Sequence, residues 1–212
     1  MEIKIWSDVR CPFCYIGKRK LEAALEQFDN SDKVKITWKS FQLDPTLETR
    51  TNINIIDNFV QTKGVTAEQA RQMLSGATHM AKEVGLNFQL DKGVLANSFN
   101  AHRLIQMAKT KELGDEIEEA LFKAHFEEPQ NIDDPEVLVS AAVSIGMNEN
   151  EVREMLSSDA FAYDVKQDEL EARNIGVRGV PFFVFDDRYA VSGAQPVEVF
   201  LETLEKAANN SQ

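Results

Sequence analysis

Two short segments near the N-terminus alternate apolar and polar residues, and a longer segment between them has apolar residues at helical spacing. The segments 2–6 (EIKIW) and 33–41 (KVKITWKSF) are rich in β-forming residues and predict two strands. Residues 12–28 predict a helix, with Pro12 at its first position, where a fixed φ and a missing N–H group are tolerated. A strand–helix–strand order implies that the two strands are parallel and joined by a right-handed crossover.

The strand pattern returns at the C-terminal end of the chain. Residues 179–185 (GVPFFVF) and 188–193 (RYAVSG) predict two more strands, and Pro196 opens a final helix that runs to about residue 207. Only Asp186 and Asp187 separate the two strands, so we expect a tight hairpin with antiparallel neighbours. The predicted sheet therefore needs both ends of the chain.

The region from about 53 to 175 has helical periodicity almost throughout and contains no convincing strand pattern. A capping box beginning at Thr66 starts one helix, and Gly85 ends it. The helices predicted here are about 66–84, 98–111, 115–127, 135–146, 149–157 and 159–174. The charge run DEIEEA (115–120) is expected to be a solvated helix face. We therefore predict an α/β protein with a sheet domain formed by 1–45 and 170–212 and an all-helical insertion at 46–169.

The composition is that of a globular protein, with 43% hydrophobic and 27% charged residues. The formal net charge of −12 argues against a nucleic-acid partner, because proteins that bind phosphate backbones present basic patches. The opening residues MEIKIWSD do not form a signal peptide, and the most apolar segments are too short to span a bilayer. We expect a cytoplasmic protein without a membrane partner.

Both cysteines of the chain, Cys11 and Cys14, lie at the start of the first predicted helix in the sequence CPFC. A disulfide between them would close a very short loop and gain little from loop entropy, which leaves a redox pair or a metal site. A zinc ion would need further ligands, and the three histidines are spread singly, so no zinc-binding spacing is present in the sequence. A zinc site formed by tertiary convergence remains the less favoured alternative, and we expect no metal.

A redox pair is favoured by the position of the cysteines on the helix. If the helix begins at Pro12, Cys11 is its N-cap residue, and unpaired N–H groups together with the positive end of the helix dipole surround its sulfur. Both effects favour the thiolate and lower its pKa. Cys11 would then attack a disulfide, and Cys14 would resolve the resulting mixed disulfide.

The segment RGVPFF precedes the third predicted strand and contains Pro181. Two interpretations remain open from local sequence. The Val180–Pro181 bond is cis and leaves the backbone of Val180 free to pair with an extended peptide, or Pro181 is trans and begins an edge strand.

Four segments, DVRCPFCYIG, NSFNAHRLIQMA, GVRGVPFFVF and YAVSGAQP, together resemble the DsbA family of thioredoxin-fold proteins and most closely its signal-less, FrnE-like branch. The resemblance covers essentially the whole chain. It implies a thioredoxin-like fold, a mixed four-stranded sheet with a large helical insertion, and disulfide exchange. By position, Cys11 is the nucleophile, Cys14 is the resolving thiol, and Val180 with a cis Pro181 contacts substrate. Pro12 and Phe13, between the cysteines, are also expected at the substrate-binding surface.

A second branch with the same fold, the 2-hydroxychromene-2-carboxylate isomerases and kappa-class glutathione transferases, is also similar to this chain. Those enzymes typically have a serine where Cys11 stands and use the thiol of bound glutathione. By that analogy Gly193, Ala194 and Gln195 would lie with Val180 near a bound glutathione. The presence of both cysteines favours redox chemistry by the protein itself, with glutathione as a redox partner rather than a resident cofactor.

His102, in NAHRL, has two interpretations: a proton shuttle that faces the thiols, or, preferred, a polar core residue that bonds a backbone carbonyl. We expect a thiol–disulfide oxidoreductase, monomeric or homodimeric, that acts on protein or small-molecule disulfides and dithiols. The alternatives are a glutathione-dependent isomerase or transferase and a non-enzymatic holdase or peptide-binding module.

Overall fold

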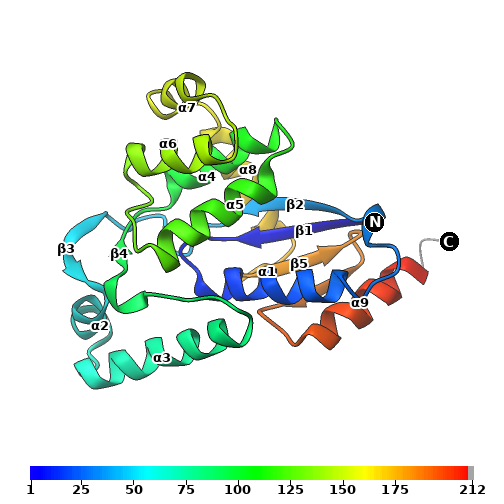
Figure 1. Ribbon diagram of the computed structural model, residues 1–212, viewed down its shortest axis with the longest axis horizontal. Helices are drawn as coiled ribbons and strands as arrows, with labels where there is room; N and C mark the ends of the chain where they lie inside the picture. Colours follow the sequence, from blue (N-terminus) through cyan, green and yellow to red (C-terminus); the bar gives the residue numbers. More distant parts are fainter. Residues whose placement is uncertain (210–212) are drawn as a thin grey trace.

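The computed structural model describes residues 1–209 and contains a four-stranded mixed sheet in the order β2-β1-β5-β6 (Figure 1). Strand β1 (Glu2–Ser7) is parallel to β2 (Lys35–Ser40) and antiparallel to β5 (Phe182–Phe185). Strand β6 (Tyr189–Ser192) is antiparallel to β5. The predicted parallel pair and the predicted hairpin are both confirmed, and each strand is somewhat shorter than its sequence pattern.

The hairpin between β5 and β6 turns at two aspartates with left-handed backbone. Asp186 and Asp187 have φ values of 47° and 53°, the positive φ of both central residues of a type I′ turn, and the Arg188 N–H closes the turn on the Phe185 carbonyl at 3.0 Å. The Asp186 carboxylate also accepts a hydrogen bond of 2.7 Å from the backbone N–H of Glu2. The turn therefore fastens the C-terminal hairpin to the start of β1.

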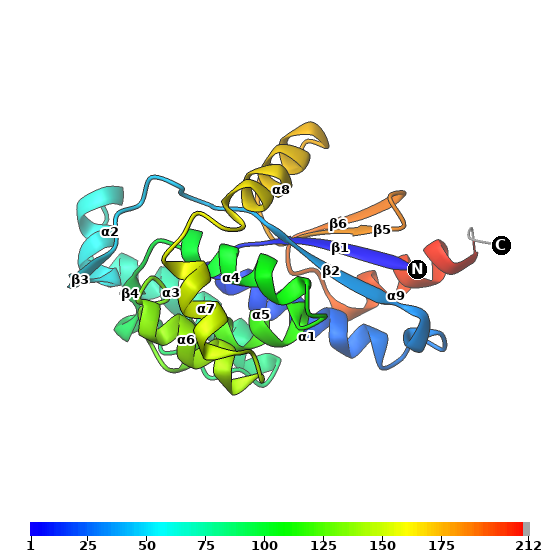
Figure 2. The same cartoon turned by 90° about the horizontal axis from the view of Figure 1, so that it is seen from above.

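Helices cover both faces of the sheet (Figure 2). Helices α1 (Pro12–Leu25) and α9 (Val197–Asn209) pack together on one face, and α8 (Ala162–Asn174) lies across the other. Successive side chains of β1 point to opposite faces of the sheet. Ile5 therefore lies in the main core, whereas Trp6 packs under α8. Helix α8 spans residue 170, where a domain boundary was predicted, and it contacts β2. The division of the chain into a sheet domain and an insertion at 46–169 stays a prediction.

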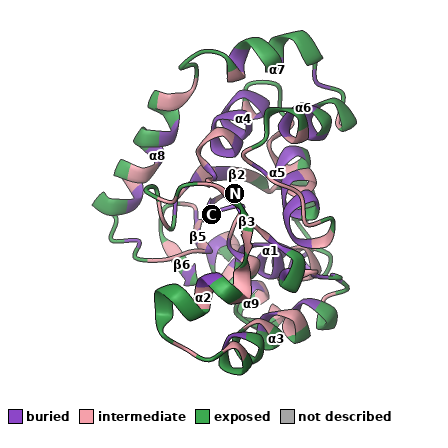
Figure 3. Ribbon diagram, turned by 90° about the vertical axis from the view of Figure 1, so that its left-hand side faces the viewer, coloured by how far each residue is buried: buried purple, intermediate pink, exposed green. Residues whose placement is uncertain are grey.

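The segment between β2 and α8 is mostly helical, as predicted. Helices α4 and α5 are largely buried, whereas α2 and α7 expose most of their residues (Figure 3). The helices of this insertion are α2 (Ile55–Lys63), α3 (Ala67–Glu83), α4 (Phe99–Lys109), α5 (Gly114–Phe122), α6 (Pro135–Ser144) and α7 (Glu149–Leu156).

The expectation that the insertion contains no strand is wrong. Strands β3 (Arg50–Asn54) and β4 (Val94–Leu95) form a small antiparallel ladder with an irregular register. Strand β4 is too short to show any alternation, and β3 is mostly polar, so neither produces a strand signal in the sequence.

The predicted helix 115–127 is interrupted by a wider turn. Helix α5 ends at Phe122 and continues as a π-helical segment, Lys123–Glu127, in which the Glu128 N–H donates to the Lys123 carbonyl at 3.0 Å. The segment buries three consecutive side chains, Ala124, His125 and Phe126, which a regular helix would turn to different faces. His125 and Phe126 consequently point toward the helix that carries the cysteines.

Helices α1 and α5 are joined by aromatic and ionic contacts. The Tyr15 ring stacks on Phe122 with centroids 4.9 Å apart, and its hydroxyl donates to the Glu119 carboxylate at 2.6 Å. The buried Lys18 ammonium lies 3.1 Å from carboxylate oxygens of both Asp115 and Glu119. These contacts fix the insertion against the helix that begins with the cysteine pair.

Candidate active site

The cysteine pair lies where β1 ends and α1 begins, as predicted. Cys11 is the N-cap residue of α1, with φ −91° and ψ 111°, and Pro12 occupies the first helical position. The Cys14 N–H donates to the Cys11 carbonyl at 3.0 Å, which closes the first turn. Both thiols are free and buried, with 4% and 1% exposure, whereas Phe13 between them is 41% exposed. The motif therefore presents an aromatic ring to solvent and keeps its sulfurs just beneath.

The two thiols differ in acidity. A hydrogen bond from the Cys14 thiol lowers the pKa of Cys11, and the backbone amides of Cys14 and Phe13 act in the same direction against burial. Burial raises the pKa of Cys14 well above its ordinary value, and the neighbouring Cys11 raises it further. This asymmetry suits a thiolate nucleophile at Cys11 beside a protonated partner at Cys14.

The loop before β5 lies directly against the pair. The Val180–Pro181 peptide bond is cis, and the Cys11 thiol donates to the Val180 carbonyl with an Sγ–O distance of 3.5 Å. Gly17 in α1 allows this loop to approach, because a Cβ there would lie 3.1 Å from both Pro181 and Phe183. Residues separated by most of the chain are thus brought together at the Cys11 sulfur.

A buried carboxylate is connected to Cys14 through one hydroxyl. The Ser7 side chain lowers the pKa of the Cys14 thiol against the effect of burial, and its hydroxyl donates to Glu118 Oε1 at 2.7 Å. Glu118 is only 1% exposed, and burial raises its pKa to about 7. The structure thus corrects the expectation of a solvated face for 115–120, because this side chain lies in the core beneath the cysteines. Its spacing from Leu121 and Phe122, three and four residues later, is the sequence signal that could have revealed its orientation.

A second buried pair, Asp8 and His102, lies beside this connection. Asp8 accepts backbone N–H groups from Arg10 at 3.1 Å and Leu43 at 2.8 Å, and His102 Nε2 lies 3.5 Å from its Oδ1. Burial would raise the pKa of Asp8, but the contact with His102 and the Leu43 N–H outweigh it, and the pKa is lowered. Among residues 1–209, neither ring nitrogen of His102 bonds a backbone carbonyl. His102 is buried, as the preferred interpretation expected, but the expected bond to a backbone carbonyl is wrong.

Comparison with known proteins assigns this arrangement to a family. Residues 2–205 match the model of the DSBA-like thioredoxin domain. The chain belongs to this family. The structure of a probable DsbA oxidoreductase from Streptomyces coelicolor is similar with a TM-score of 0.93 and 35% identity, over 99% of this chain and 90% of that one.

Two further comparisons extend the picture. An uncharacterized protein of Bacillus subtilis (strain 168), YwbO, is 27% identical over 100% of this chain and 98% of its own length. The cytosolic disulfide reductase DsbM from Pseudomonas aeruginosa has a TM-score of 0.69 and 16% identity, covers 99% of both chains, and has also been solved with glutathione. At that identity the likeness shows the fold alone.

The remaining predicted site residues of this DSBA-like chain lie around the end of β6. The Gly193 N–H donates to the Pro181 carbonyl at 2.8 Å, which places the 193–195 segment beside the cis-proline loop. The Ala194 carbonyl accepts from Lys20 Nζ at 3.0 Å, and the Gln195 side chain donates to the Ser192 carbonyl at 2.9 Å. The segment is therefore fastened to α1 and to the loop by its own hydrogen bonds.

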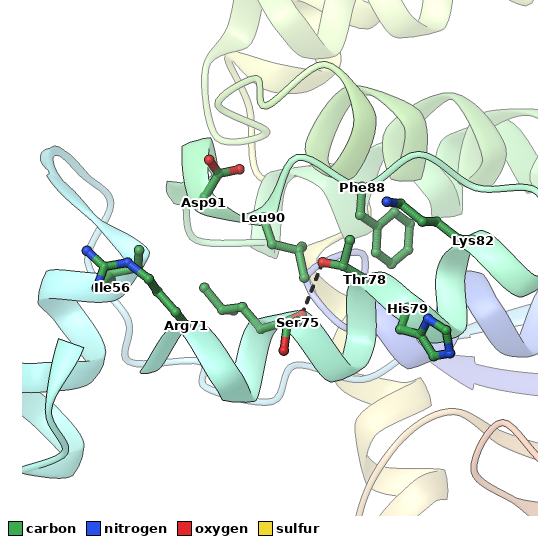
Figure 4. A pocket seen from close by; sticks show the side chains of 10 residues that line it. Ile56, Arg71, Ser75, Thr78, His79, Lys82, Phe88, Leu90 and Asp91 are labelled. Atoms are coloured by element: carbon green, nitrogen blue, oxygen red, sulfur yellow. Dashed lines mark hydrogen bonds between the residues drawn. The ribbon is translucent and has the colours of Figure 1, made fainter. Parts of the chain in front are cut away.

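Two cavities flank helix α3 of the DSBA-like chain. One, of about 290 Å³, adjoins the cysteine motif and is lined by Arg10, Pro12, Phe13 and side chains of the insertion. The other, of about 360 Å³, contains no motif residue and lies between α3 and the segment around Leu90, with Arg71 at one end and His79 and Lys82 at the other (Figure 4).

The described residues contain neither a membrane-spanning helix nor a cluster of metal ligands. Between residues 1 and 209 no helix is both long and apolar enough to cross a bilayer. Over the same residues, no three histidine, cysteine or acidic side chains gather as potential metal ligands.

Proposed function

We propose that this DSBA-like protein is a dithiol–disulfide oxidoreductase that reacts through a mixed disulfide on Cys11. The observation that carries the proposal is the environment of the Cys11 sulfur. The Cys14 thiol and the backbone amides of Cys14 and Phe13 stabilise its thiolate against burial. A thiolate held in this way is the attacking species in disulfide exchange.

The exchange has two steps. The Cys11 thiolate attacks one sulfur of a substrate disulfide, the substrate S–S bond breaks, and one substrate half leaves as a thiolate. The Cys14 thiol then loses its proton and attacks the Cys11 sulfur, which forms the internal disulfide and releases the second half. The substrate gains two electrons and the cysteine pair loses them; with an oxidised pair and a dithiol substrate the same steps run in reverse.

Glu118 is the proposed acceptor of the Cys14 proton. Cys14 is almost fully enclosed, so its proton has no direct route to solvent, whereas Ser7 links it to the Glu118 carboxylate. Because the pKa of Glu118 is raised to about 7, this group can both accept and return a proton near neutral pH.

Substitution of each cysteine tests these roles. We expect Cys11→Ser to abolish reduction of a model disulfide, and Cys14→Ser to accumulate a covalent adduct that is visible by mass spectrometry of the intact protein. Equal residual activity in the two variants would contradict the assignment. Pro181→Thr is expected to keep the fold but prolong the mixed disulfide, measured as a slower release of the second substrate half.

Glutathione is the proposed redox partner, and a reducing compartment such as the cytoplasm is the proposed location. Equilibration in glutathione buffers, followed by alkylation and mass analysis, tests the redox assignment. A single two-electron transition between Cys11 and Cys14 supports the oxidoreductase, and its midpoint indicates the favoured direction against a cytosolic poise of about −220 to −320 mV. Glutathione that accumulates on Cys11 without closure of the pair would instead indicate a glutathione-dependent isomerase or transferase.

A further inference from the structure

The cavity beside the cysteine motif has an apolar wall with two polar groups in it. Its lining, taken from the described residues, contains the flanks of the motif, Arg10, Pro12 and Phe13, but no residue of the Val180–Pro181 loop. The other lining residues are Ile55, Phe59, Met73, Leu74, Ala77, Leu90, Gly93, Val94, Leu95, His125 and Phe126. The cavity and the cis-proline loop therefore adjoin the cysteine motif at different places, and a ligand in the cavity would not occupy the position of the loop.

Arg10 is the only formally charged side chain in this lining. Its Nη1 is enclosed and has no hydrogen-bond partner, although Arg10 helps to lower the pKa of both Asp8 and Asp44. The enclosed Nη1 shows that the guanidinium lacks a full set of acceptors, and because Arg10 also lines the cavity, a ligand carboxylate there would pair with its charge. In a protein with a net charge of −12, this cation is a local attraction for an anion.

His125 supplies the second polar group. It is 7% exposed, and burial and the nearby Arg10 lower its pKa to about 4, so the ring is neutral at physiological pH. A hydrogen bond with the backbone of Gln130 engages the ring, whereas Nδ1 has no partner. The π-helical segment is what turns this side chain toward the cavity.

The dimensions favour a small ligand over a polypeptide. A volume of about 290 Å³ lies just below the typical range of small-molecule sites, which is about 300 to 1,000 Å³. The lining includes two exposed apolar side chains, Phe13 at 41% and Met73 at 47% exposure, which suit an aromatic or branched aliphatic body.

We propose that this cavity binds the apolar, carboxylate-bearing half of a low-molecular-weight disulfide, with the carboxylate on Arg10 and the sulfur directed to Cys11. The inference rests on the proposed function and names its substrate class. The chemical step is the exchange given above: Cys11 forms the mixed disulfide with one half of the ligand, and the other half leaves as a thiolate. The dithiol form of the protein supplies both electrons, so a single turnover needs no added reductant.

Single-turnover kinetics of the pre-reduced, full-length protein test the proposal with three disulfides. Dithiobis(nitrobenzoate) is aromatic and anionic, dithiodipyridine is aromatic and neutral, and hydroxyethyl disulfide is aliphatic and neutral. For the anionic probe we expect saturation with concentration, and Arg10→Gln should raise its apparent Kd about 10-fold or more, as expected for loss of a hydrogen bond to a charged group. The neutral probes should change less than about twofold.

Two variants serve as controls. Arg71→Gln removes the same charge from α3 outside this cavity and should leave all three rates unchanged. Met73→Trp adds bulk at an exposed position of the cavity wall and should slow both aromatic probes but not hydroxyethyl disulfide.

The outcomes separate this inference from the proposed function. Equal effects of Arg10→Gln on all three probes, or no effect on any, would overturn the carboxylate site while leaving disulfide exchange intact. Failure of the wild-type protein to exchange with every probe would instead overturn the oxidoreductase assignment.

Discussion

Glu118 provides a quantitative test of the buried acid beneath the cysteines. Its side chain is 1% exposed, and burial raises its pKa from 4.5 to about 7, despite the hydrogen bond from Ser7. In the unfolded chain the same carboxyl group titrates near its ordinary value. Between these two pKa values the folded protein holds a proton that the unfolded chain has released, so the folded state loses stability as the pH rises.

The size of this loss follows from the pKa difference. Each unit of pKa difference corresponds to about 1.4 kcal/mol, so Glu118 should cost about 3 kcal/mol of folding free energy once the pH exceeds about 7. Below about pH 4.5 both states are protonated and the cost disappears. Glu118→Gln keeps the shape and removes the titration. The variant should therefore gain about 3 kcal/mol relative to wild type between about pH 4.5 and pH 8.

Urea unfolding of the reduced proteins across this pH range measures the difference directly. Glu116→Gln, at an exposed position on the same helix, is the matched control and should shift the free energy of unfolding by a small amount that does not depend on pH. Curves of unfolding free energy against pH that run parallel for wild type and Glu118→Gln would refute the raised pKa. The role of Glu118 in proton transfer from Cys14 would then lose its physical basis.

Three further predictions concern the thiol pair and its framework. Cys14→Ala should raise the pKa of Cys11, because the Cys14 thiol makes the largest contribution to lowering it; the pH dependence of Cys11 alkylation measures this, and an unchanged midpoint would contradict it. Gly17→Ala should destabilise the fold by roughly 1 to 3 kcal/mol, because the added Cβ meets Pro181 and Phe183. Gly76→Ala is the control and should stabilise the fold by about 1 kcal/mol, because no atom lies within contact of its added Cβ. Equal shifts of the two variants in urea unfolding would show that α1 has room to adjust. Arg103→Met should cost roughly 1 to 3 kcal/mol in the same assay, because it removes the donor to the Ala160 carbonyl and one donor to the buried Met155 carbonyl. A loss below about 1 kcal/mol would mean that water replaces the guanidinium.

The sheet and the position of the cysteines could be predicted because local sequence determines them. Alternation specifies β1 and β2, Pro12 sets the start of α1, and the aspartates at 186 and 187 accept the left-handed backbone of a tight turn. Cys11 at the N-cap follows from these elements alone. The approach of the Val180–Pro181 loop came from resemblance to a family, since local sequence left both proline isomers open.

The parts that could not be predicted depend on tertiary packing. The π-helical segment Lys123–Glu127 has ordinary helix-forming residues, and the contact of its Phe126 ring with Tyr15 of α1 is a tertiary feature that local sequence does not show. Glu118 lies in a run of acidic residues whose composition indicates solvent exposure, yet its neighbours on the helix face are buried. His125 and Arg10 line one cavity although they are far apart in sequence. The residues that distinguish this site therefore come largely from the insertion.

The pairing of β1 with β5 has a consequence for synthesis of the chain on the ribosome. Glu2 and Asp186 are hydrogen-bonded across a sequence separation of 184, whereas β1, α1 and β2 are complete within the first part of the chain. A nascent chain can therefore form the strand–helix–strand unit, with both thiols in place, long before the loop that covers Cys11 leaves the exit tunnel. Throughout this interval either thiol can exchange with a disulfide that it meets, which forms a mixed disulfide and releases a thiolate. A chain released before β5 is made therefore carries a thiol pair without the Val180–Pro181 loop against Cys11.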